Sequence, residues 1–234
     1  MLMRILDLIF TRAKKAVDAN FNIPRQLLIK ECDLVVDIGA NNGQWISTVR
    51  NYGYKGEALC IEPLKENYMN LKANNFNNTM TLNCAIGNRN GYIYINKASN
   101  DGKSSSILEM GSYHKSAAPD IKFIGREKVK INKLSQVLKT YKHKKIYLKI
   151  DTQGYEFEVL KSIDQKTLAK IFVFEIETNL VSTYKNVKLI EDVIKLLRGF
   201  GFEPFRLENG FGMPNHGQQL QADIIFVRNE YMHI

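Results

Sequence analysis

Several features that would assign a protein to a class at once are scarce in this sequence. Three cysteines in 234 residues, Cys32, Cys60 and Cys84, are too few and too scattered for a disulfide framework or a zinc site. Each lies in or beside an apolar run, where cysteine acts as a small hydrophobic residue. Because an odd number of unpaired thiols favours a reducing compartment, we expect a cytoplasmic protein.

Long apolar runs are also missing. None approaches the roughly 18 residues that a membrane span needs, so we expect no transmembrane segment. Repeats, low-complexity tracts and proline-rich linkers are absent too, and 44% hydrophobic with 24% charged residues excludes a disordered or fibrous chain. We expect a helical extension over residues 1–30 and one domain over residues 31–234.

The extension begins with an amphipathic pattern between Met1 and Val17, where apolar residues recur at helical spacing. Its basic face leaves contact with a membrane surface open. We favour packing on the domain or on a second subunit, which would give a homo-oligomer. The net charge of +9 is compatible with nucleic acid, an anionic membrane surface or a phosphorylated substrate, and it does not choose among them.

Short β-rich runs alternate with helical ones, which predicts βαβ units and a mostly parallel sheet. We expect strands over residues 34–38, 56–61, 81–86, 92–96 (at an edge), 145–150, 171–176, 203–207 and 222–227, and helices from about 44 and over 63–74, 154–163 and 187–200. The last two strands predict an antiparallel hairpin at the end of the sheet. Residues 98–125 lack periodicity, and a loop of that length predicts a lid over a substrate.

The end of the first predicted strand carries the sharpest pattern, Asp37 followed by a turn that contains Gly39 and Gly43. Glycines at such a turn let the backbone approach a ligand closely. A second acid, Glu62, ends the next strand, where a carboxylate can accept both hydroxyls of a ribose. Such charge-assisted bonds contribute about 1.5–3 kcal/mol each. Turn glycines and a helix-start acid explain each residue singly, but together at successive strand ends they favour a nucleotide site.

With these motifs the sequence resembles the FkbM-type methyltransferases, which depend on S-adenosylmethionine. The matching segments are DIGANNG at 37–43, IEP at 61–63, AIG at 85–87, the serines at 104–106 and KIDTQGYE at 149–156. The resemblance implies an α/β, Rossmann-like class I methyltransferase fold with a seven-stranded, mostly parallel sheet and an antiparallel C-terminal hairpin. It also implies that residues at the strand ends bind the cofactor. These are Asp37, Gly39, Asn41 and Gly43 around the methionine part, Glu62 at the ribose, and Cys84 and Ala85 at the adenine.

Charged side chains cluster at the ends of two later strands. Lys149 and Asp151 share one face of a strand, as Glu175 and Glu177 do on the next. Methyl transfer to a hydroxyl needs a group that removes its proton, and either a carboxylate base or a divalent cation (Mg²⁺ or Mn²⁺) held by carboxylates serves. We expect Asp151 first, and then Glu175, to be catalytic or to bind the metal.

Each of these residues also has a structural explanation. Asp151 can cap the following helix, and Lys149, although a catalytic candidate, can pair with Glu175. His216, before the last strand, is a further candidate base, and His114 in the long loop a weaker one. In that loop we expect Ser104, Ser105 and Ser106 to bind a polar acceptor, and Lys103 and Lys115 to meet a phosphate.

FkbM-type enzymes are similar in methylating hydroxyls of sugars and natural products. We therefore expect an O-methyltransferase whose partner is a sugar or nucleotide-sugar in the biosynthesis of a cell-surface polysaccharide. The alternative is an RNA or other nucleic-acid methyltransferase, which the charge suggests. Its usual Pro-Pro-aromatic motif is absent after residue 150, so we expect no nucleic-acid partner. A non-catalytic protein that kept the cofactor fold is a third hypothesis, which the acids at 37, 62 and 151 disfavour.

Overall fold

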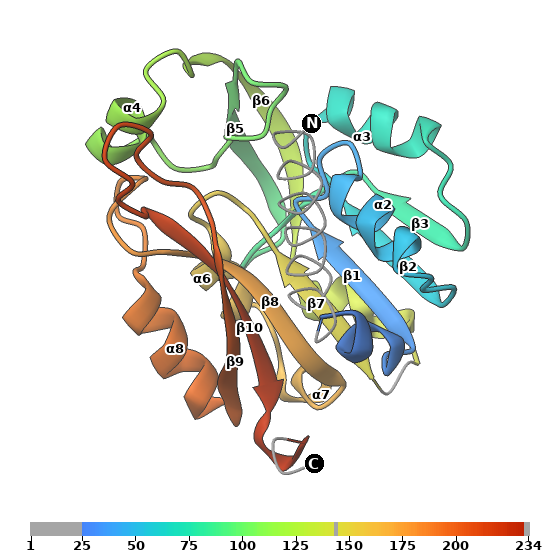
Figure 1. Cartoon of the computed structure of the whole chain (residues 1–234). Coiled ribbons are helices and arrows are strands. Elements are labelled where there is room, and N and C mark those ends of the chain that lie inside the picture. Colours follow the sequence, from blue (N-terminus) through green and yellow to red (C-terminus); the bar gives the residue numbers. More distant parts are fainter. Residues whose placement is uncertain (1–24, 143–144, 232–234) are drawn as a thin grey trace, which may run out of the picture.

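A seven-stranded sheet forms the centre of the computed structural model, which describes residues 25–142 and 145–231 (Figure 1). The predicted helix within residues 1–17 lies outside the described residues. The strand order is β3-β2-β1-β7-β8-β10-β9, in which β10 runs antiparallel to both of its neighbours and the remaining pairs are parallel. The strands are β1 (Leu34–Ile38), β2 (Glu57–Ile61), β3 (Thr79–Leu82), β7 (Ile146–Ile150), β8 (Ile171–Asn179), β9 (Phe202–Asn209) and β10 (Gln221–Arg228). This confirms the predicted class I methyltransferase fold and the C-terminal hairpin.

Helices cover both faces of this sheet because apolar residues of β1 alternate between two cores. Leu34, Val36 and Ile38 face one core with side chains of α5, α6 and α8, whereas Val35 faces the other with side chains of α2 and α3. The helices are α2 (Gln44–Asn51), α3 (Lys65–Ala73), α4 (Ser112–Ala117), α5 (Leu134–Val137), α6 (Glu156–Leu160), α7 (Gln165–Leu168) and α8 (Ile190–Gly199). Two 3₁₀ turns, η1 (Leu138–Thr140) and η2 (Asn229–Tyr231), complete the elements, and no described helix is long and apolar enough to cross a membrane.

A second sheet of three strands stands near the carboxyl ends of the central strands (Figure 1). It consists of β4 (Ala85–Ile86), β5 (Gly91–Ala98) and β6 (Phe123–Asn132) in the order β4-β6-β5. The strand predicted over 92–96 is therefore at an edge, but of this small sheet. Strand β6 was not predicted, and the strand predicted over 81–86 is divided between β3 and β4. The chain leaves the central sheet at Asn83, whose side-chain amide donates to the carbonyls of Glu62 and Pro63.

The register of the central strands places charged residues side by side at their carboxyl ends. Asp37 on β1 is the register partner of Lys149 on β7, and Lys149 is in turn the partner of Glu175 on β8. Each of the three is flanked along its strand by buried apolar residues. Charged groups at such positions need a partner or a ligand.

Candidate functional site

A cavity of about 410 Å³ opens at the carboxyl ends of β1, β2 and β7. This is the position at which open α/β sheets bind ligands. Most of the residues that the sequence predicts for the site line it: Asp37, Gly39, Asn41, Glu62, Cys84, Ala85, Lys149 and Asp151. Gly43, Glu175 and His216 are not among the lining residues.

The turn after β1 brings the backbone against the neighbouring strand. Gly39 has φ +85°, and a Cβ atom there would lie 1.8 Å from the carbonyl oxygen of Asp151. Only glycine fits this approach. Asn41, at φ +46°, follows in the left-handed region. Gly43, at φ +89°, precedes α2 and faces Phe76 and Leu71, so the structure gives it a packing role.

Glu62 lies at the end of β2 with only 5% of its surface exposed. Its two carboxylate oxygens accept the backbone N–H groups of Asn41 and Leu64, both at 2.8 Å. Burial raises the pKa of Glu62 to about 7, although the two N–H bonds act in the opposite direction. Each oxygen keeps a free lone pair, so the carboxylate can still accept a pair of hydroxyls.

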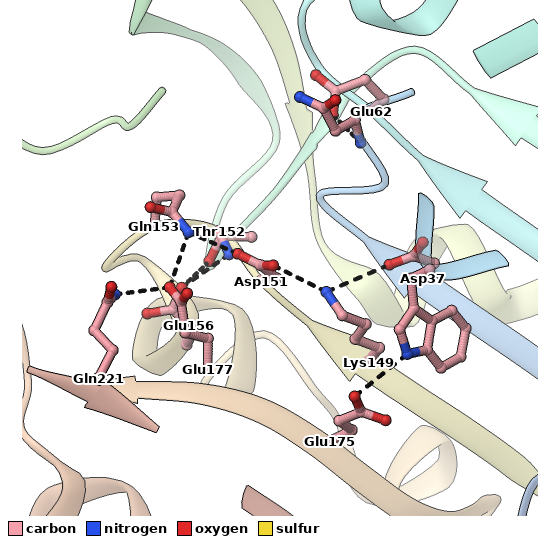
Figure 2. Close-up of polar contacts among 12 residues, drawn as sticks. Asp37, Glu62, Lys149, Asp151, Thr152, Gln153, Glu156, Glu175, Glu177 and Gln221 are labelled. Atoms are coloured by element: carbon pink, nitrogen blue, oxygen red, sulfur yellow. Dashed lines mark hydrogen bonds and ion pairs between the residues drawn. The ribbon is translucent and has the colours of Figure 1, made fainter. Parts of the chain in front are cut away.

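Lys149 lies between two aspartates at the floor of the cavity (Figure 2). Its ammonium is 3.0 Å from a carboxylate oxygen of Asp151 and 3.9 Å from one of Asp37. Burial alone would lower the pKa of Lys149. The attraction of these carboxylates outweighs burial and raises the pKa above its usual value, so the ammonium stays charged. Both oxygens of Asp37 are buried and accept no hydrogen bond within the described residues. Burial, only partly opposed by Lys149, raises the pKa of Asp37 to about 6.

A family model, the methyltransferase FkbM domain, matches residues 37–204, well over half of the chain. The chain belongs to the FkbM methyltransferase family. The match contains the turn after β1, Glu62, and the segment from Lys149 to Glu156. No curated protein matches the chain.

Solved structures of low sequence identity resemble this FkbM family member. A putative S-adenosylmethionine-dependent methyltransferase from Listeria monocytogenes has 10% identity and a TM-score of 0.47, over 84% of this chain and 91% of its own. Fibrillarin from Aeropyrum pernix, solved with natively bound S-adenosyl-L-methionine, has 12% identity and a TM-score of 0.45, over 85% and 68%. A putative RNA methyltransferase from Pyrococcus horikoshii has 11% identity and a TM-score of 0.43, over 83% and 74%.

In this FkbM methyltransferase Glu175 is held by a residue that the sequence did not indicate. The guanidinium of Arg25 donates to both of its carboxylate oxygens, at 3.0 and 3.2 Å. The Tyr147 hydroxyl donates to it at 2.5 Å and the Trp45 indole N–H at 3.3 Å. Within the described residues no ion pair joins Lys149 to Glu175, so the alternative that these two residues pair with each other is wrong.

The two predicted metal ligands do not form a metal site. Asp151 is bound by Lys149, and the carboxylate of Glu175 is filled by Arg25, Tyr147 and Trp45. Over residues 25–142 and 145–231 no group of three or more His, Cys, Asp or Glu side chains could hold an ion. The donors at this site therefore do not fit Mg²⁺ or Mn²⁺.

Gln153 is a cavity residue that sequence reasoning missed, although it lies within the KIDTQGYE segment. Its amide NH₂ donates to Asp151 at 2.8 Å and to Glu177 at 2.9 Å (Figure 2). Its carbonyl accepts the Tyr184 hydroxyl at 2.8 Å. All three contacts fix the direction of the amide. Gln153 has a backbone φ of +55°, which is uncommon for a residue with a side chain and marks the position as unusual. This conformation cannot be recognised from the sequence.

The motif that follows Asp151 is ordered by Glu156 rather than by Asp151. One carboxylate oxygen of Glu156 accepts the backbone N–H groups of Thr152 and Gly154 and the Thr152 hydroxyl. Burial raises the pKa of Glu156 to about 7 against these bonds. The carboxylate of Asp151 is therefore not needed as a helix cap and faces the cavity instead.

The segment predicted as a lid contains helix α4 and packs on the site through its serines. The Ser106 hydroxyl donates to the carbonyl of Gln153 at 2.6 Å, and Ser105 accepts the N–H of Ala98 at 2.9 Å. Ser104, which is buried, accepts the side-chain N–H of Asn100 at 3.0 Å. Lys103 lines the cavity.

The remaining candidates lie farther from the cavity. Lys115 is exposed on α4, and His216 is exposed on the loop between β9 and β10. His114 is buried between Tyr184 and Phe211, with ring centroids at 5.4 and 5.2 Å, and burial lowers its pKa. The catalytic roles of Glu175 and His216 stay predictions, and their positions favour Asp151 over both.

Proposed function

We propose that this protein is an S-adenosylmethionine-dependent O-methyltransferase that acts on a hydroxyl of a sugar or sugar-containing substrate. One observation carries the proposal beyond family membership. A single cavity combines the Glu62 carboxylate, which can accept a pair of hydroxyls, with the buried and unbonded carboxylate of Asp37. A nucleoside that also carries a positive charge satisfies both groups.

The lining residues fit such a cofactor. Glu62 binds the ribose hydroxyls, Asp37 faces the cationic part, and apolar side chains around Cys84 and Ala85 surround the adenine. The close approach of Gly39 to Asp151 brings the two parts of the site together. When bound, the cofactor supplies an electrophilic methyl group on its sulfonium.

Asp151 is the residue we assign to the acceptor hydroxyl. Lys149 and Gln153 hold its two oxygens at 3.0 and 2.8 Å, which fixes the carboxylate at the cavity wall. Each oxygen retains a lone pair that can accept the hydroxyl proton. Asp151 would accept the hydroxyl proton as the acceptor oxygen bonds to the methyl carbon and the sulfur–methyl bond breaks, which leaves S-adenosylhomocysteine; Asp151 would then release the proton to water. The Lys149 ammonium, 3.0 Å away, fixes one oxygen of Asp151 and leaves the carboxylate open to the cavity.

Polar groups at the cavity support the proposed class of acceptor. Lys103 and Ser105 border it, and a lysine beside hydroxyl-binding groups suits the phosphate and sugar of a nucleotide-sugar. The three thiols are free and buried, which fits a reducing compartment such as the cytoplasm. The net charge of +9 keeps nucleic acid as the alternative acceptor.

The test is methyl transfer to a panel of nucleotide-sugars and to RNA, followed by mass spectrometry. We expect a gain of one methyl group on a nucleotide-sugar, unchanged by a chelator, and a loss of about 100-fold or more in rate for Asp151→Asn with little change in cofactor affinity. Asp120→Asn, an exposed aspartate outside the cavity, is the matched control. Transfer to RNA alone would support the alternative, and full activity of Asp151→Asn would remove Asp151 from the mechanism.

A further inference from the structure

Arg25 precedes every motif of the family, yet it reaches the strand next to the cavity. Arg25 lies in the helical stretch at 25–30 and pairs through two hydrogen bonds with Glu175, 150 residues later. Arg25 is 13% exposed and Glu175 2% exposed, so water screens this pair weakly. A second carboxylate, that of Glu208 on β9, binds Arg25 at 2.5 Å.

Glu175 in turn fixes the position of Trp45, a residue that lines the cavity. It accepts the indole N–H of Trp45, and Trp45 lines the cavity. Tyr147 binds the same carboxylate through its hydroxyl, and its ring packs against Trp45 with centroids 5.8 Å apart. The position of Trp45 therefore depends on a carboxylate that Arg25 neutralises.

The same neutralisation explains which partners Lys149 takes. Lys149 has Asp37 as register partner on one side and Glu175 on the other. Figure 2 shows its ammonium pointing to Asp37 and Asp151. Glu175 instead accepts the indole N–H of Trp45. Without Arg25, Glu175 would be a buried and uncompensated charge beside Lys149, and it would compete with the two aspartates for the ammonium.

We propose that Arg25 is a positioning residue of the cofactor site, which acts by neutralising Glu175. It thereby leaves Lys149 to Asp37 and Asp151, and it keeps Trp45 in the cavity wall. This inference rests on the proposed function, because the site it organises is the cofactor site. It assigns a role in the site to a part of the chain that the family match, residues 37–204, does not include.

Binding of S-adenosylhomocysteine tests the inference without an acceptor. Trp45 is the only tryptophan, so its fluorescence reports on the cavity directly. Arg25→Gln should raise the Kd about tenfold or more, and the double variant Arg25→Gln/Glu175→Gln should return it to within about threefold of wild type, because no buried charge is left unpaired. Glu208→Gln is the matched control, since it removes the other partner of Arg25 and spares Glu175. We expect it to lower the Tm and leave the Kd unchanged.

Circular dichroism establishes that each variant is folded at the temperature of the titration. An Arg25→Gln protein that is folded and binds like wild type would overturn the inference, as would a double variant that binds as poorly as the single one. If Arg25→Gln does not fold, the double variant decides, and it must bind like wild type although it lacks Arg25. A wild-type protein that binds no S-adenosylhomocysteine would instead refute the proposed function, and the inference would fall with it.

Discussion

Gly39 shows how one residue without a side chain joins two strands into a site. Its backbone N–H donates to the carbonyl of Ile61 at 2.9 Å, and its Cα faces the carbonyl of Asp151. The same turn therefore contacts the ends of β2 and β7, where we propose that the ribose and the acceptor bind. Gly53 has nearly the same conformation, φ +84°, but a Cβ there would meet nothing within 4 Å.

A comparison of these two glycines separates the cost of a left-handed backbone conformation from the cost of a steric clash. Gly53→Ala carries only the cost of a left-handed conformation, about 1–2 kcal/mol of unfolding free energy. Gly39→Ala adds a backbone clash, so we expect a loss of about 3 kcal/mol or more and no measurable binding of S-adenosylhomocysteine. Urea unfolding and titration calorimetry measure both effects. Equal losses in the two variants would show that the close approach to Asp151 does not matter.

The raised pKa of Glu62 predicts how ligand binding depends on pH. The ionised carboxylate binds ribose hydroxyls more strongly, so the Kd of S-adenosylhomocysteine should fall about tenfold between about pH 6 and pH 8 as Glu62, with a pKa of about 7, loses its proton. Glu62→Gln should bind more weakly and show a smaller dependence on pH. A wild-type Kd that is constant over this range would contradict the assignment.

The raised pKa of Glu62 also predicts how the stability of the unliganded protein changes with pH. The pKa of Glu62 rises from 4.5 to about 7 on folding, so the folded protein without ligand binds this proton more tightly than the unfolded chain. The contribution of Glu62 to the free energy of unfolding therefore falls as the pH rises from about 4.5 to about 7, and it stays low above that. Glu62→Gln should remove this part of the slope in urea titrations.

Residues next to one another in a motif were predictable, and residues that meet across the fold were not. Asp37, Gly39 and Glu62 follow from acids and glycines at strand ends. Arg25 and Gln153 do not, because their importance depends on side-chain direction and on contacts between distant parts of the chain. The pairing of Arg25 with Glu175 needs the register and packing of the folded sheet, which no local pattern contains.

At the scale of elements, the buried strands of the central sheet were predicted well, whereas the half-exposed strand β6 was not. β1, β2, β7 and β8 are buried and rich in branched residues, whereas β6 alternates charged residues with Val129 and Ile131 and was missed. The segment before β6 is fixed to the central domain by hydrogen bonds of Ser106. Ser106 accepts the N–H of Leu108 at 2.9 Å while it donates to the carbonyl of Gln153.

Removal of this hydroxyl should loosen one wall of the cavity. Ser106→Ala leaves two partly buried backbone groups, the N–H of Leu108 and the carbonyl of Gln153, without this partner, which costs about 1 kcal/mol. We expect faster amide hydrogen exchange over residues 99–108 and weaker binding of S-adenosylhomocysteine. Ser116→Ala, at an exposed position on α4, is the control and should change neither. Unchanged exchange in Ser106→Ala would mean that other contacts hold the segment.

At the scale of the molecule, the chain as a whole is basic, whereas the cavity is lined by more acidic than basic residues. The chain carries +9, yet Asp37, Glu62 and Asp151 line the cavity with Lys149 and Lys103 as the basic residues among the lining. An acidic cavity suits a cationic cofactor such as S-adenosylmethionine. The overall charge, by contrast, governs encounter with anionic partners rather than the chemistry of the site.

The central claim is that this cavity binds S-adenosylmethionine, and the fluorescence of Trp45 tests it most directly. Titration with S-adenosylmethionine should give a saturable change in emission at one site per chain, and Glu62→Gln should weaken the binding about tenfold. NAD should give no such change. A spectrum that responds to NAD and not to S-adenosylmethionine would contradict the account.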